Sequence, residues 1–108
     1  MCVMEFQPLT CNLGAISAAE RPRYSHLKSC VRAAMRDRRE LPDGYSYSLD
    51  SAKITLSEVS EWITLERLCC PFLALDLHTT GDASRLNMRG PDGSKAILEK
   101  EFPAGGHL

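Results

Sequence analysis

The stretch from Leu65 to Thr79 reads LERLCCPFLALDLHT and joins two elements of different periodicity. A helical pattern that begins at residue 51 or 52 ends at Cys70, because Pro71 pushes the residue before it out of the helical conformation. From Leu73 onward, leucines alternate with other residues, as in a strand with one face in the core. The stretch therefore predicts a helix that is followed almost directly by a strand.

Working outward from this junction, the chain alternates helical and strand patterns. Ser17 and Glu20 have the spacing of a capping box, which marks the start of a helix. The predicted elements are an edge strand within 3–9, a helix at 17–39, a strand at 45–49, a helix from 51 or 52 to 70, a strand at 73–79, a strand around 86–88 and a helix at 94–102. This order, (β)-α-β-α-β-β-α, predicts an α+β fold with three to four strands packed against about three helices.

The helix at 51–70 connects two of the predicted strands. A crossover helix places the strands at 45–49 and 73–79 parallel, while the last two strands form an antiparallel hairpin. We therefore expect a small mixed sheet. A length of 108 residues, 44% of them hydrophobic, fits a single domain over residues 1–108, with an N-terminal segment at 1–16 and a flexible tail at 103–108.

Charge and composition limit the partners. Seven basic and three acidic residues lie within 20–40, whereas 41–82 holds seven acids and two bases, and this asymmetry is compatible with a homodimer. The basic stripe formed by Lys28, Arg32, Arg36 and Arg39 is expected to be a solvated helix face, since the pI near 6.3 disfavours nucleic-acid binding. With no apolar run of membrane-spanning length and no leader pattern, we expect a cytoplasmic protein whose five cysteines are reduced thiols.

One carboxylate falls on an apolar helix face. On a helical wheel Leu56, Val59, Ile63 and Cys70 share one side of the second helix, and Glu66 lies in its middle. A buried carboxylate must pair, protonate or bind a ligand.

Two interpretations of Glu66 remain open from the residues alone. As a structural anchor, it accepts a hydrogen bond from Tyr45 or Tyr47, or pairs with Arg85 or Arg89. As a functional group, it is a ligand or an acid/base group beside the neighbouring thiols.

The adjacent thiols Cys69 and Cys70 are the second notable feature. Thiolates are the ligands that soft ions prefer, and Cys11, in the loop before the first helix, is a candidate third ligand. The alternative is that both cysteines pack as small hydrophobic residues. A nucleophilic cysteine is disfavoured, because the C-terminus of a helix destabilises a thiolate.

The run from Leu65 to Leu73 resembles a group of small bacterial proteins with a Leu-Glu-Arg-x-Cys-Cys-Pro-Phe signature. The resemblance extends to three further runs, at 11–15, 41–45 and 90–93. That group has no established activity, so the resemblance supports the choice of the cluster and of Cys11 without implying a mechanism.

The leading hypothesis is a non-enzymatic thiol site with Cys69, Cys70, Cys11 and Glu66 as candidate ligands. Its cargo would be a soft or borderline metal ion, such as zinc, copper(I) or mercury, or a metalloid. The first alternative is a protein-interaction or structural domain with core cysteines. The second is a thiol-dependent enzyme that uses Glu66 as acid or base.

Overall fold

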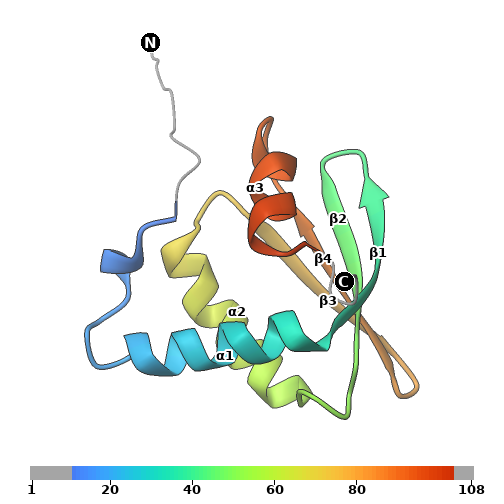
Figure 1. Ribbon diagram of the computed structural model, residues 1–108, viewed down its shortest axis with the longest axis horizontal. Helices are drawn as coiled ribbons and strands as arrows, with labels where there is room; N and C mark the ends of the chain where they lie inside the picture. Colours follow the sequence, from blue (N-terminus) through green and yellow to red (C-terminus); the bar gives the residue numbers. More distant parts are fainter. Residues whose placement is uncertain (1–10, 104–108) are drawn as a thin grey trace.

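The computed structural model describes residues 11–103, which form three α-helices, a short 3-10 helix and a four-stranded sheet (Figure 1). The α+β class and the approximate order of the elements are thus confirmed. In chain order the elements are η1 (Leu13–Ala15), α1 (Arg21–Ala34), β1 (Met35–Leu41), β2 (Gly44–Leu49), α2 (Leu56–Cys69), β3 (Ala74–Thr80), β4 (Ala83–Arg89) and α3 (Ser94–Glu101). The strand predicted within 3–9 and the end of the tail, 104–108, lie outside the described residues.

All neighbouring strands are antiparallel, in the order β1-β2-β4-β3. The expected mixed sheet is therefore wrong, whereas the predicted parallel direction of the strands at 45–49 and 73–79 is correct. These strands, now β2 and β3, do run in the same direction, but β4 lies between them and pairs with both. The β3–β4 hairpin was predicted correctly, whereas insertion of its second strand next to β2 was not.

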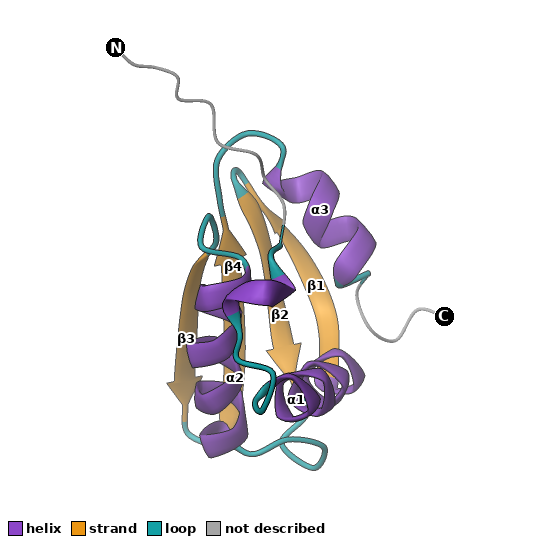
Figure 2. Ribbon diagram, turned by 90° about the vertical axis from the view of Figure 1, so that its left-hand side faces the viewer, coloured by secondary structure: helices purple, strands orange, loops and turns teal. Residues whose placement is uncertain are grey.

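The molecule has two layers, with the helices on one face of the sheet (Figure 2). Alternate strand residues point from the sheet toward the helices. There they pack against the apolar faces of α1 and α2 and against Phe102, which directly follows α3. The largest fully buried side chains are Trp62, Tyr47, Ile16, Leu27, Met35, Leu86, Met88 and Leu98. The opposite face of the sheet carries mostly polar residues.

The first helix ends earlier than its sequence pattern predicts. It stops at Ala34 and not at about Arg39 as predicted, and Met35–Leu41 form β1. A bulge centred on Asp37, whose φ is 48°, interrupts the pairing of β1 with β2. Arg85 from β4 supports this bulge by donating to the Asp37 carbonyl oxygen at 2.9 Å and to Ser46 Oγ at 2.8 Å.

Other boundaries differ by a few residues. The Ser17–Glu20 capping contacts form, but residues 18–20 make a turn and α1 begins at Arg21. Thr55 caps α2 with a full capping box, so this helix starts four or five residues later than predicted. Gly93 occupies the N-cap of α3, and Ser94 is its first residue and not its cap. Within residues 11–103, no helix has the length and apolarity needed to cross a bilayer.

Candidate thiol site

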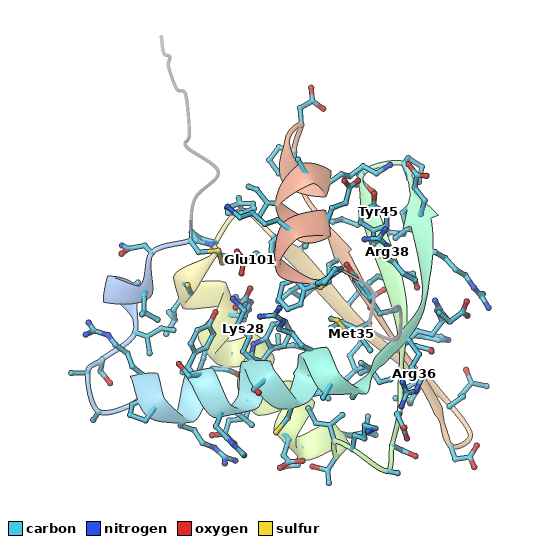
Figure 3. The ribbon with its side chains drawn as sticks, in the orientation of Figure 1. Lys28, Met35, Arg36, Arg38, Tyr45 and Glu101 are labelled. Carbon is cyan, nitrogen blue, oxygen red and sulfur yellow. A yellow bond between two sulfur atoms is a disulfide. The ribbon has the colours of Figure 1, made fainter. Side chains whose placement is uncertain are left out.

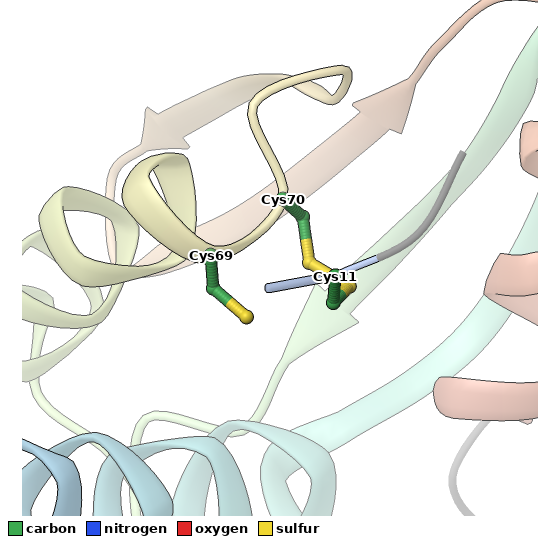
Figure 4. Close-up of side chains that lie close together, drawn as sticks. All are labelled: Cys11, Cys69 and Cys70. Atoms are coloured by element: carbon green, nitrogen blue, oxygen red, sulfur yellow. A yellow bond between two sulfur atoms is a disulfide. The ribbon is translucent and has the colours of Figure 1, made fainter. Parts of the chain in front are cut away.

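Three cysteines meet where α2 ends. Cys69 is the last residue of α2, Cys70 follows it, and Cys11 approaches from the N-terminal segment (Figure 4). Their three sulfur atoms all lie within 4.8 Å of one another. The structure thus brings together the three cysteines that the sequence had singled out, and it leaves Cys30 elsewhere, on α1.

Cys11 and Cys70 form a disulfide, with their Cα atoms 4.5 Å apart. This differs from the expectation that all the cysteines are reduced. The sequence separation of 59 residues gave no sign of the pairing, because it depends on how the N-terminal segment packs against the end of α2. Cys69 and Cys30 are free.

Backbone hydrogen bonds fix the end of α2 and the segment beside it. The Cys70 N–H donates to the Glu66 carbonyl oxygen at 2.7 Å, which closes the last helical turn. The Asn12 N–H donates to the Cys69 carbonyl oxygen, also at 2.7 Å. Further along the segment, Ile16 is fully buried in the core. Cys11 is therefore held near α2 by contacts other than the disulfide itself.

The three cysteines differ in their access to solvent. Cys11 is exposed, whereas Cys69 is 3% exposed and Cys70 is fully buried. A reagent from solution therefore meets Cys11 first.

Glu66 is buried, at 1% exposure, one turn before Cys70. Its neighbours on the predicted helix face are only partly as expected, because Val59 is buried while Leu56 is about half exposed. Burial raises the pKa of the Glu66 carboxyl above its usual range, and the hydrogen bond from Tyr24 opposes this rise. The three sulfurs form the candidate ligand group without this carboxyl.

Tyr24 is the hydrogen-bond donor of Glu66: its hydroxyl lies 2.6 Å from Glu66 Oε1. None of the four partners that we had predicted is used. Those residues bond elsewhere: Tyr45 to Glu99, Tyr47 to the Phe102 carbonyl oxygen, Arg85 to Ser46 and Asp37, and Arg89 to Asp43. Tyr24 lies on the apolar stripe of the first helix, so a buried hydroxyl in need of an acceptor was the signal that could have identified it.

An ion pair lies near this buried polar group. Lys28 Nζ on α1 is 2.9 Å from Glu101 Oε1 at the end of α3, and the two side chains meet between the helices (Figure 3). The positive charge of Lys28 also acts against the rise of the Glu66 pKa.

The thiol of Cys69 is adjacent to the same group. Burial raises its pKa, and the nearby Tyr24 hydroxyl opposes this effect. Burial thus favours the protonated thiol of Cys69, which is a different cause from the helix end considered in the sequence. Tyr24 links Glu66 and Cys69 into one polar cluster inside the core.

Replacing Tyr24 by phenylalanine is expected to lower the free energy of unfolding by about 1–3 kcal/mol, because it leaves the buried Glu66 carboxyl without its donor. Urea unfolding of Tyr24→Phe measures this. Tyr45→Phe is the matched control, since Tyr45 donates to Glu99, a carboxylate on the surface. An equal loss in both variants would contradict the role given to Tyr24.

Fold and site together define a small α+β protein with a cluster of three cysteines at the end of its central helix. Comparison with protein-family models, with curated proteins and with solved structures finds no significant match. The geometry of the three cysteines is therefore the basis for proposing a function.

Proposed function

We propose that the protein, when its disulfide is reduced, binds one soft metal or metalloid ion through Cys11, Cys69 and Cys70. The observation that carries the proposal is the convergence of three sulfur atoms within 4.8 Å. Two thiolates that each lie about 2.3 Å from one metal ion are at most about 4.6 Å apart. Three thiolates around one ion lie roughly 4 Å apart, so after reduction the bonded sulfurs of Cys11 and Cys70 must separate while the Cys69 sulfur stays near its present position.

The set of ligands favours ions that are satisfied by two or three thiolates. Copper(I), mercury(II) and trivalent arsenic meet this condition, whereas structural zinc takes four ligands. Glu66 in this proposal is not a ligand: it accepts the hydrogen bond that orients Tyr24, and the Tyr24 hydroxyl lowers the pKa of the neighbouring Cys69 thiol against the effect of burial. Zinc is the weaker candidate, since among residues 11–103 the group contains three ligands.

The packing around Cys11 supports binding by the reduced protein. The hydrogen bond from Asn12 to Cys69 and the buried side chain of Ile16 do not involve the disulfide. Reduction therefore leaves the three thiols close together, and less entropy is lost when an ion binds them.

Native mass spectrometry of the reduced protein tests the proposal with copper(I), mercury(II), zinc and arsenite as separate probes. We expect one ion per chain for at least one soft probe, and loss of that adduct in Cys69→Ser and in Cys70→Ser. Cys30→Ser is the matched control and should bind like the unchanged protein, because Cys30 lies outside the cluster. Adducts that survive both cluster substitutions, or no adduct at all, would refute the proposal.

A structural role is the second candidate function, and the full burial of Cys70 favours it. In this case the disulfide only ties the N-terminal segment to α2. Substitution of Cys70 would then lower stability without removing any binding activity, which the same experiment distinguishes.

A homodimer and a cytoplasmic location stay predictions. The uneven charge supports the first, because α1 is rich in basic residues and two acids of α2, Glu58 and Glu61, are at least partly exposed. Sedimentation at low and high salt tests for a dimer held by opposite charges.

A further inference from the structure

The disulfide has a third cysteine beside it. Cys69 Sγ lies within 4.8 Å of both bonded sulfurs, and its side chain projects from the end of α2 on the side of the Cys11 segment (Figure 4). A thiol next to a disulfide can attack it by exchange, in which a thiolate displaces one sulfur of the bond. The cluster therefore contains a disulfide and an internal thiol able to react with it.

Access from solution is restricted to one end of the bond. Exchange requires the incoming sulfur to approach along the S–S axis, opposite the leaving sulfur. Cys11 is exposed, whereas Cys70 is fully buried. An external thiol can therefore attack at Cys11 and release Cys70.

We propose that the Cys11–Cys70 disulfide exchanges with small-molecule monothiols, which enter at Cys11, and that Cys69 is a second internal partner for Cys11. This activity uses the cluster but does not require that it bind an ion. In the presence of such thiols, this exchange determines what fraction of the protein has the Cys11–Cys70 disulfide reduced, which is the form proposed for ion binding.

The thiolate of the small thiol forms a bond to Cys11 Sγ, the Cys11–Cys70 bond breaks, and Cys70 leaves as a thiolate that takes a proton from water. A second small thiol attacks the small-molecule sulfur of the mixed disulfide, which releases a small-molecule disulfide and the Cys11 thiol. Two electrons pass from two small thiols to the protein disulfide.

The mixed disulfide on Cys11 has an alternative fate. Cys69 or Cys70 can attack Cys11 Sγ and expel the small thiol, which restores a disulfide with no net change in oxidation state. Direct bonding between Cys69 and Cys70 is disfavoured, because adjacent Cα atoms are about 3.8 Å apart, which is shorter than the usual span of a disulfide. Cys11 is thus the shared partner of two competing thiols.

The first test uses variants in which Cys2 and Cys30 are serine, oxidised with glutathione disulfide and mapped by peptide mass spectrometry without reduction. Cys70→Ser should form a Cys11–Cys69 disulfide, and Cys69→Ser should form Cys11–Cys70. Cys11→Ser should form no internal disulfide and accept only glutathione. A Cys70→Ser protein that folds, as judged by circular dichroism, but leaves Cys11 and Cys69 unpaired would overturn the role of Cys69.

The second test uses the unchanged sequence, so it does not depend on the folding of any variant. The oxidised protein is mixed with reduced glutathione, quenched with acid at short times and mapped. We expect glutathione on Cys11 at least tenfold more often than on Cys70. Equal labelling, or labelling of Cys70 alone, would overturn entry at Cys11, and ion binding by the reduced protein would be unaffected by that result.

Discussion

Reduction of the Cys11–Cys70 disulfide is expected to lower the free energy of unfolding by about 4 kcal/mol, the value that the chain-entropy model assigns to a closed loop of this length. The loop is long because the two cysteines are 59 positions apart. Urea unfolding with and without a phosphine reductant measures the change. Cys11→Ser is the control: it should already have the lower stability and should not respond to the reductant.

A reductant effect of equal size in Cys11→Ser would show that the stability change comes from elsewhere in the chain. The same measurement also separates the two candidate functions. An ion that binds only the folded, reduced protein restores about 2.7 kcal/mol when its free concentration is 100 times the dissociation constant. A disulfide with a purely structural role gives no such recovery.

Glu66→Gln is expected to make the protein more stable than the unchanged sequence at neutral and alkaline pH, with a difference that grows as the pH rises. The carboxyl is buried and its pKa is raised in the folded state. A raised carboxyl pKa gives stability that is fully present below the unfolded value of 4.5 and is lost as the pH rises from there through the folded pKa. The amide does not ionise and keeps an oxygen that can accept from Tyr24.

The measurement is urea unfolding of both proteins at several pH values from 4 upward, where the difference should change by at most about 1.4 kcal/mol per pH unit. Glu61→Gln is the control. Its carboxyl is exposed, and the hydrogen bond from Arg23 lowers its pKa, so the sign of the pH dependence is reversed. A difference between Glu66→Gln and the unchanged protein that is independent of pH would contradict the assignment of Glu66 as a buried acid.

The sequence predicted α2, the β3–β4 hairpin and the position of Glu66 on the apolar face of α2, because these depend on local periodicity and on one proline; it left the burial of Glu66 open. It did not predict β1. All five residues from Arg36 to Glu40 are charged, and Arg36 and Arg39 continue the basic solvent face of the preceding helix. The strand is formed by antiparallel pairing with β2, and its bulge at Asp37 is supported by Arg85, 48 positions away, a contact that no local pattern contains.

The candidate site, like the fold, was predicted only in part from the sequence. Cys69, Cys70 and Cys11 were predicted as a group, since two are adjacent and the third lies in a run of the same resemblance. The sequence predicted neither the Cys11–Cys70 disulfide nor the hydrogen bond that Tyr24 donates to Glu66. Both depend on which segments pack against the end of α2, where Cys11 arrives from the N-terminal segment and Tyr24 from α1. Tertiary contacts of this kind are not encoded in spacing along one helix.

The central claim is that three sulfurs of one chain can hold one ion. X-ray absorption at the arsenic edge of the reduced protein, loaded with one equivalent of arsenite, counts the sulfur ligands directly. If Cys11, Cys69 and Cys70 bind the ion, the arsenic has three sulfur neighbours in the unchanged protein and in Cys30→Ser, and two in Cys11→Ser. Oxygen neighbours alone, or a spectrum that Cys11→Ser leaves unchanged, would contradict this claim.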